Sequence, residues 1–176
     1  MQQSTSGETR RLVVVRHAKA EPSAPSDHER TLAERGHGDA AEAGRWLQRQ
    51  EILADAALVS DAMRARETWA GLAAGAEWDV EPDFSAALYA AGPDSAFDLI
   101  RETPATVGTL VVVGHNPTMA YLAELIDDGE GDDDAITSLV SRGFPTSAVA
   151  VFDVVESWSE LAAGSGTVRL FHVGGS

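Results

Sequence analysis

Two histidines of this 176-residue chain each follow a short aliphatic run. Arg16 and His17 come directly after Leu12–Val15, and His115 comes after Leu110–Val113 and one glycine. Short runs of this kind are typical of buried strands. Histidine and arginine side chains, together with the N-terminus of a helix, have the composition of a phosphate-binding pocket. We therefore expect phosphate chemistry at the ends of these two strands.

A third segment adds a hydroxyl group and a second arginine. The run Ala56–Ser60 predicts another strand, and Arg64 follows it at the start of an expected helix. In open α/β sheets the carboxyl ends of the strands line the ligand crevice. Ser60 and Arg64 are therefore expected to meet the two histidine segments at one edge of one sheet.

The overall composition narrows the classes of function. The chain has 13 Lys and Arg against 28 Asp and Glu, a net charge of −15, which argues against a nucleic-acid or anionic-membrane partner. Its single lysine, Lys19, lies close to Arg16, so this positive cluster is informative in an acidic protein. The absence of cysteine and of an H-E-x-x-H motif disfavours a metal site, and no G-x-G-x-x-G follows the first strand. We expect neither a metal nor a cofactor.

Strands and helices alternate along the chain. This pattern predicts an α/β fold, a three-layer α/β/α sandwich with a mostly parallel central sheet. We expect a disordered tail at 1–9 and a single domain at 10–176. The apolar runs are too short to span a membrane and no secretory signal is visible, so a cytoplasmic location is expected. The expected strands cover 12–15, 56–60, 109–113, 147–154 and 167–173, the expected helices cover 31–50, 62–74, 94–102 and 117–126, and turns are expected at 78–93.

Local signals set three of these boundaries. Thr31 and Glu34 have the spacing of a capping box, which predicts that the first helix opens at Thr31. Asn116 can cap the helix that is expected to begin at Pro117. Asp127–Asp134 lacks the spacing of a calcium-binding loop and is expected to be a solvated acidic loop.

Four segments between residues 11 and 126 resemble the sequence signature of the histidine phosphatase superfamily. Leu12–Lys19 is similar to the family's strand followed by R-H-G, and Gly114–Asn116 is similar to the segment of its second histidine. Arg30–Gly36 resembles R-x-L-T-x-x-G, and Ser60–Thr68 resembles S-x-x-x-R-A-x-x-T. The resemblance implies a phosphoglycerate mutase-like fold and a phosphatase that forms a phosphohistidine intermediate.

The resemblance also implies a role for each matching residue. His17 would be the nucleophile that accepts the phosphoryl group. Arg16, Arg64 and His115 would hold the phosphate oxygens, where fixed cationic donors supply most of the catalysis. The further candidates for substrate binding are Lys19, Ser60 and Asn116.

Several of the polar residues have a second interpretation. Lys19 could extend the positive pocket or be a solvated loop residue, and Ser60 could bind phosphate or merely end its strand. His28 and His37 are expected at the surface. His172, in the last expected strand, is expected to be structural.

Two departures from the superfamily pattern bear on the substrate. Ala18 stands where the wider family has glycine, which resembles the short phosphohistidine phosphatase branch of the SixA type. The family's general acid has no clear counterpart. The candidates nearby are Glu81, Asp83 and Tyr89, each expected at the surface or in a turn. An open site without an acid should favour substrates whose leaving group departs easily.

The function that follows is a metal-independent phosphatase acting on protein phosphohistidine. One alternative keeps the chemistry but takes a small phosphate ester, such as a sugar phosphate or nucleotide. Another is a non-catalytic phosphate-binding module that acts as an interaction protein. Inorganic phosphate and vanadate are expected to inhibit.

Overall fold

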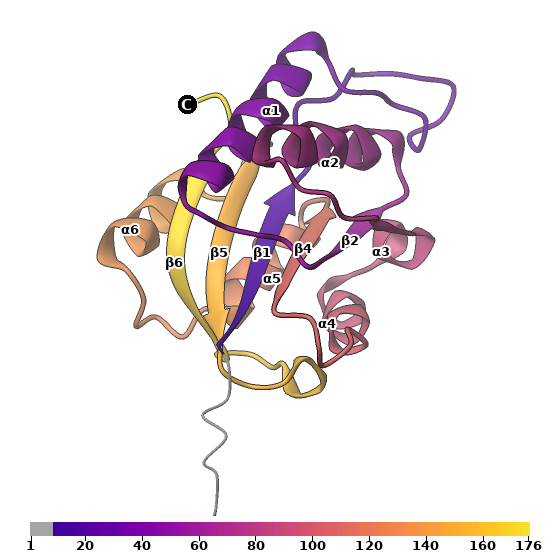
Figure 1. The fold of residues 1–176 in the computed structure, drawn as a ribbon. Coiled ribbons are helices and arrows are strands. Elements are labelled where there is room, and N and C mark those ends of the chain that lie inside the picture. The colour runs from indigo at the N-terminus through magenta and orange to yellow at the C-terminus, as the bar shows by residue number, and fades with distance from the viewer. Residues whose placement is uncertain (1–8) are drawn as a thin grey trace, which may run out of the picture.

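One six-stranded sheet forms the centre of the molecule (Figure 1). The computed structural model describes residues 9–176, so the tail predicted at 1–9 lies outside the described residues except for Thr9. The strand order is β3-β2-β4-β1-β5-β6. The strands are β1 (Arg10–Arg16), β2 (Ala56–Ser60), β3 (Asp83–Ser85), β4 (Thr109–Gly114), β5 (Ala148–Val154) and β6 (Gly166–Val173).

The helices lie between these strands, as the alternating pattern predicts. A short 3₁₀ helix, η1 (Trp158–Glu160), lies in the connection between β5 and β6. The α-helices are α1 (Glu34–Arg49), α2 (Met63–Ala76), α3 (Ala86–Ala90), α4 (Pro93–Arg101), α5 (Thr118–Ile126) and α6 (Asp133–Arg142).

Five of the six strands point the same way. The pairs β3–β2, β2–β4 and β4–β1 are parallel, and only β5 runs against its neighbours β1 and β6. The prediction of a mostly parallel sheet is confirmed. Val113 of β4 lies opposite Val15 of β1 and Val59 of β2, so the carboxyl ends of three adjacent strands meet at one edge.

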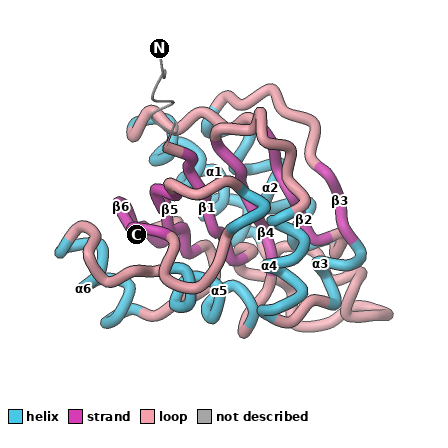
Figure 2. Tube along the Cα trace, turned by 90° about the horizontal axis from the view of Figure 1, so that it is seen from below, coloured by secondary structure: helices cyan, strands magenta, loops and turns pink. Residues whose placement is uncertain are grey.

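Helices cover both faces of the sheet because its central strands are apolar on both faces. In β1, Val13 and Val15 pack with the buried residues of α1 and α2. Leu12 and Val14 pack on the opposite side with residues of α4, α5 and α6. Figure 2 shows the two groups of helices on either side of the strands. This arrangement confirms the predicted three layers.

The first helix begins later than predicted. α1 starts at Glu34 with Ala33 at its N-cap, and no side chain caps it. The backbone around Thr31 is instead tied to the segment after β1. The Glu21 N–H donates to the Thr31 carbonyl (2.8 Å) and the Ala33 N–H to the Lys19 carbonyl (2.9 Å). The capping-box prediction was wrong because these pairings keep Thr31 outside the helix.

Two regions hold more regular structure than predicted. The stretch expected to be turns contains β3 and α3, which are too short to give a clear hydrophobic period. The acidic run at 127–134 ends as the start of α6, where the Asp132 carboxylate accepts the N–H of Ala135 (2.9 Å). The carboxylates therefore serve partly as a helix cap.

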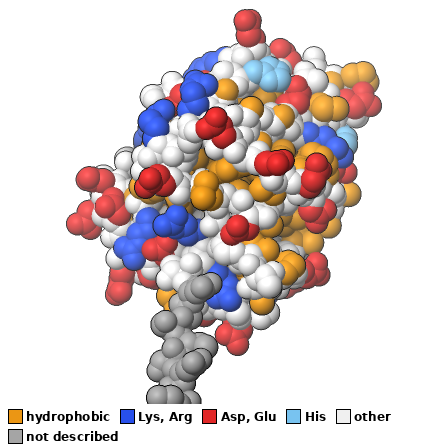
Figure 3. Space-filling model, viewed as in Figure 1, with side chains coloured by type: hydrophobic (Ala, Val, Ile, Leu, Met, Phe, Trp, Pro, Cys, Tyr) orange, Lys and Arg blue, Asp and Glu red, His pale blue; other side chains and the backbone are white. Residues whose placement is uncertain are grey.

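The surface is acidic, as the composition requires. Figure 3 shows Asp and Glu side chains spread over the viewed face, with the basic groups in a few clusters. No helix within residues 9–176 is long and apolar enough to cross a membrane.

Candidate active site

The carboxyl ends of β1, β2 and β4 bring two histidines and a serine together. The ring centroids of His17 and His115 lie 5.2 Å apart. The Nε2 atom of His115 lies 2.7 Å from Oγ of Ser60. The pairing of Arg16 with Gly114 places both histidines one residue beyond the same level of the sheet. The predicted convergence of the three segments is therefore present.

His17 is held in one orientation and one tautomer by the backbone. Its Nδ1 lies 2.7 Å from the carbonyl oxygen of Ala18. A carbonyl can only accept a hydrogen bond, so Nδ1 carries the proton and Nε2 keeps its lone pair. The side chain is buried, with the residue 8% exposed. Burial, helped by the charges of Arg64 and Arg16, lowers the pKa of His17 to about 4, so the ring is neutral at pH 7.

The backbone at Ala18 is anchored by the second arginine segment. Its N–H donates to Oγ1 of Thr68 (2.9 Å), whose hydroxyl donates to the Arg64 carbonyl (2.7 Å). Thr68 is 1% exposed. The threonine of the S-x-x-x-R-A-x-x-T segment thus links the loop after His17 to α2.

His115 is also kept neutral. Burial and the neighbouring cationic groups lower its pKa to about 3. Its contact with Ser60 uses Nε2, while Nδ1 is buried and has no hydrogen-bond partner among the described residues. Ser60 is itself fully buried and accepts the N–H of Ala62 (3.3 Å). Ser60 thus both ends its strand and orients His115.

The two arginines enter the site from β1 and α2. Nη1 of Arg16 donates to the carbonyl of Phe144 (3.4 Å), and burial lowers the pKa of Arg16. Arg64 is 5% exposed and donates from Nη1 and Nη2 to Asp27. The Nε atoms of both arginines are buried without a partner.

Unpartnered polar atoms are concentrated in this site. Five side-chain nitrogen or oxygen atoms within residues 9–176 are buried without a partner, and three of them belong to Arg16, Arg64 and His115. Buried polar groups normally find hydrogen-bond partners, in protein or in a ligand. Donors on cationic and imidazole groups suit the oxygens of a phosphate.

A second set of residues, which the sequence did not single out as a group, forms the rim of the site. We use "rim" for Asp27, His28, Arg30 and Tyr89. The Asp27 carboxylate accepts from Arg30 Nε (3.1 Å), Arg64 Nη2 (3.0 Å) and the Tyr89 hydroxyl (2.6 Å). The centroid of the Tyr89 ring lies 5.5 Å from the centroid of the His115 ring and 5.1 Å from that of the His28 ring. Arg30 belongs to one of the segments that resemble the family pattern, Arg30–Gly36. No local sequence pattern around Asp27 indicates a functional residue.

Of the three candidates for a general acid, only Tyr89 lies at the site. Glu81 and Asp83 are exposed. Asp83 pairs with Leu58, two residues before the end of β2, on the edge strand of the sheet. Tyr89 donates its hydroxyl to Asp27, which raises the pKa of Tyr89.

The remaining candidates have different surroundings. Lys19 is exposed in the loop after His17. Asn116 uses both ends of its amide on the backbone, donating to the Phe144 carbonyl (2.7 Å) and accepting from Ala120 (3.1 Å). The prediction that Asn116 is the N-cap was off by one residue, because α5 begins at Thr118 and its N-cap is Pro117. The Asn116 amide still accepts an N–H of the first turn from the position before the cap.

The other histidines lie outside the strand-end cluster. His37 is exposed on α1. His28, expected at the surface, is half-buried in the rim and pairs with Asp61 (2.9 Å). His172 stacks on Trp46, with ring centroids 4.6 Å apart, and contacts a glutamate of α1.

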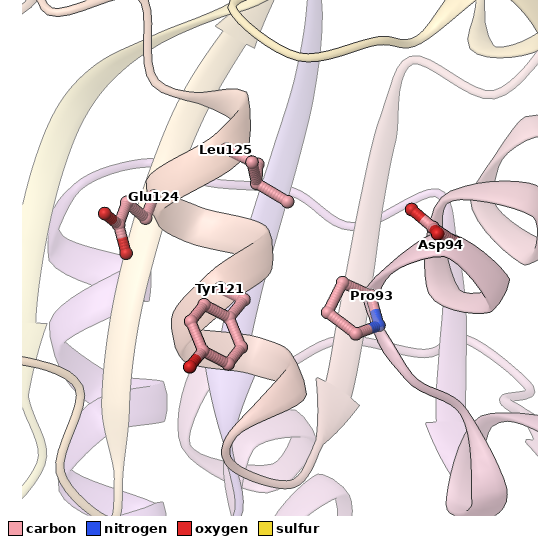
Figure 4. A pocket seen from close by; sticks show the side chains of 5 residues that line it. All are labelled: Pro93, Asp94, Tyr121, Glu124 and Leu125. Carbon is pink, nitrogen blue, oxygen red and sulfur yellow. The ribbon is translucent and has the colours of Figure 1, made fainter.

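A shallow pocket elsewhere on the surface has the wrong chemistry for phosphate. It lies between α4 and α5, and Figure 4 shows two carboxylates among its lining side chains. None of its lining residues is basic. They are Pro93, Asp94, Tyr121, Glu124 and Leu125.

Comparison with known proteins identifies the family. Residues 12–88 match the histidine phosphatase superfamily (branch 1). The uncharacterized protein Rv1276c of Mycobacterium tuberculosis is 38% identical over 160 residues, which cover 90% of this chain and 99% of that protein. The chain belongs to the histidine phosphatase superfamily.

Within the superfamily the chain is of the SixA type. A protein from Nakamurella multipartitia, described as a candidate phosphohistidine phosphatase SixA, is 28% identical, with a TM-score of 0.77 over 96% of this chain and 98% of that one. The protein histidine phosphatase SixA solved with tungstate shares the fold at 23% identity, with a TM-score of 0.71 over 93% of this chain and 96% of that one. The predicted phosphoglycerate mutase-like fold is confirmed, and these similarities support a phosphatase.

Proposed function

We propose that this chain is a metal-independent phosphohistidine phosphatase that acts on phosphorylated proteins through a phosphohistidine intermediate on His17. The observation that carries the proposal is the state of His17, a buried neutral imidazole with Nδ1–H bound to the Ala18 carbonyl and Nε2 free to attack. The similarity to SixA-type proteins supports the choice of substrate.

In the first step, Nε2 of His17 attacks the phosphorus atom and the bond from phosphorus to the substrate breaks. The negative charge on the phosphoryl oxygens is met by Arg16, Arg64 and His115, whose unpartnered nitrogens are already buried there. These donors need little rearrangement at the moment of reaction, which is the condition for efficient electrostatic catalysis.

In the second step, water attacks the phosphorus of the phosphorylated His17. The bond between phosphorus and Nε2 breaks, its electron pair returns to Nε2, and both water protons leave with the phosphate as a monoanion. Nδ1 keeps its proton throughout, because this N–H is hydrogen-bonded to the Ala18 carbonyl. His17 is therefore released from phosphorus as a neutral imidazole. The enzyme returns to its starting state without an added proton donor.

Substitution of the nucleophile tests the intermediate. His17→Ala should lower turnover by at least about a thousandfold, as expected when a nucleophile is removed. Binding of phosphate or vanadate should persist because Arg16, Arg64 and His115 remain. In the unaltered enzyme, rapid quench during turnover should trap acid-labile, base-stable phosphate on His17.

Two outcomes would decide against this function. Turnover by the His17→Ala variant at the rate of the unaltered enzyme would contradict the mechanism. If the unaltered protein binds phosphate but hydrolyses neither a phosphohistidine peptide, p-nitrophenyl phosphate nor a sugar phosphate, it is a binding module. If it prefers the sugar phosphate, the substrate is a small ester.

Metal independence is tested separately. The proposed electrophiles are guanidinium and imidazole groups, which can do the charge stabilisation that a Lewis acid would otherwise supply. Activity should therefore stay within about twofold in excess EDTA, well short of the loss expected on removing a catalytic metal. Loss on chelation and recovery with magnesium or zinc would contradict this part of the proposal.

A further inference from the structure

The carboxylate of Asp27 is fixed at the mouth of the site by three donors. Arg30 binds Oδ1, while Arg64 and Tyr89 bind Oδ2. Hydrogen bonds from Tyr89, Arg64 and Arg30 hold the pKa of Asp27 well below its usual range. It is therefore an anion during the reaction and an unsuitable proton donor in this state.

This carboxylate lies on the solvent side of the nucleophile. The Asp27 side chain is 54% exposed, whereas His17 is 8% exposed. The aromatic rings lead from the interior to the rim in the order His17, His115, Tyr89, and Tyr89 contacts Asp27. An in-line attack by His17 drives the leaving group away from the nucleophile, toward the solvent side where Asp27 lies.

A phosphohistidine substrate requires a particular protonation state of its leaving group. Its ring leaves as a neutral imidazole only if the ring nitrogen remote from phosphorus carries a proton. Before the bond breaks, that ring is a cation with an N–H to donate. His17 has the same requirement, and there the Ala18 carbonyl accepts the hydrogen bond of the remote N–H.

We propose that Asp27 is a specificity-determining residue, which accepts the remote N–H of the phosphohistidine ring and so selects a protonated nitrogen leaving group. The inference rests on the proposed function. Nε2 of His17 forms the new bond to phosphorus, the bond from phosphorus to the substrate nitrogen breaks, and that nitrogen keeps the electron pair. The remote proton stays on the ring, so the step needs no further proton.

The hydrogen-bonding capacity of Asp27 allows this contact. Phosphoryl oxygens compete with Oδ2 for Nη2 of Arg64, and this competition frees an acceptor position on the carboxylate. Arg30 and Tyr89 continue to hold Asp27 in place. The same negative charge at the mouth repels esters whose leaving group is itself acidic.

The test is the ratio of kcat/KM for a phosphohistidine peptide to kcat/KM for p-nitrophenyl phosphate, whose leaving group has no N–H. Asp27→Asn removes the charge and keeps the size. It should lower kcat/KM for the phosphohistidine peptide by about 10–100-fold, the size expected for one charge-assisted hydrogen bond. The fall for p-nitrophenyl phosphate should be much smaller, so the ratio falls about tenfold or more.

Asp61→Asn is the matched control, because it removes a nearby carboxylate that pairs with His28 rather than with the Arg64 network. It should leave the ratio within about threefold, as for a partly exposed ion pair. An equal fall on both substrates in Asp27→Asn would show that Asp27 only positions Arg64, and would overturn the inference. If the unaltered enzyme hydrolyses p-nitrophenyl phosphate but not phosphohistidine, the proposed function itself fails, and this inference fails with it.

Discussion

The strand-end residues of the site and the rim residues differ in how they are held. His17, Ser60 and Arg64 are buried, and they are positioned by parallel strands and the start of α2. Asp27 and Tyr89 come from a loop and a five-residue helix, and they are positioned mainly by contacts with one another. One set depends on the sheet, and the other depends on side-chain pairing at the surface.

This difference separates two tasks of the enzyme. Rigid, desolvated groups are best placed to stabilise the charge of a phosphoryl group, because electrostatic interactions are stronger away from water. Residues on loops can vary more freely without disturbing the core. The strand ends therefore suit the chemistry common to the superfamily, and the rim suits the choice of leaving group.

The two arginines that contact Asp27 test this division. Arg64→Gln should lower kcat/KM for the phosphohistidine peptide by about a thousandfold, because arginines that contact a transferred phosphoryl group supply effects of this order. Arg30→Gln should cost about tenfold or less, since the Arg30 contact supports only the rim. Steady-state kinetics would measure both, with circular dichroism to confirm that each variant is folded. Equal losses would remove the distinction between the two sets.

The strand-end set could be predicted from the sequence because each member lies next to a strong local signal. Val13 and Val15 belong to an aliphatic run that is buried on both faces, and such a run predicts a central parallel strand. The carboxyl ends of adjacent parallel strands must meet at one edge. That geometry alone brings His17 and His115 together, whatever the intervening segments do.

The rim could not be predicted, because its contacts join residues distant in the chain. Asp27 and Tyr89 are 62 residues apart, and neither has a local pattern that indicates the other. Tyr89 lies in the segment where the general acid of the family is expected, but its partner carboxylate, Asp27, lies outside that segment. Asp27 lies in a Pro- and Ser-containing loop, where local signals indicate only a turn.

The prediction that the first helix begins at Thr31 was wrong for a related reason. A capping box is a local device worth about 1 kcal/mol, which a few tertiary hydrogen bonds can outweigh. Thr31 pairs with the segment after β1, and the N–H of Leu32 donates to the Glu67 carboxylate of α2 (3.1 Å). These contacts also fix the loop that carries Asp27 and Arg30. Contacts between residues distant in the chain therefore explain both the wrong helix start and the failure to predict the rim.

The two buried histidines of the site should also make the stability of the molecule depend on pH. The pKa is lowered to about 4 for His17 and to about 3 for His115, mainly by burial, whereas an unfolded histidine has a pKa of about 6.5. Below pH 6.5 the unfolded chain therefore binds more protons than the folded one, so the free energy of unfolding falls as the pH falls. From pH 7 to pH 5 these two groups should together remove about 3–4 kcal/mol from the free energy of unfolding, measured in urea titrations. The double variant His17→Gln, His115→Gln should lose correspondingly less over the same interval. The same loss in the double variant and the unaltered protein would mean that the strand-end histidines are not kept neutral by burial, and the proposed nucleophile would lose its physical basis.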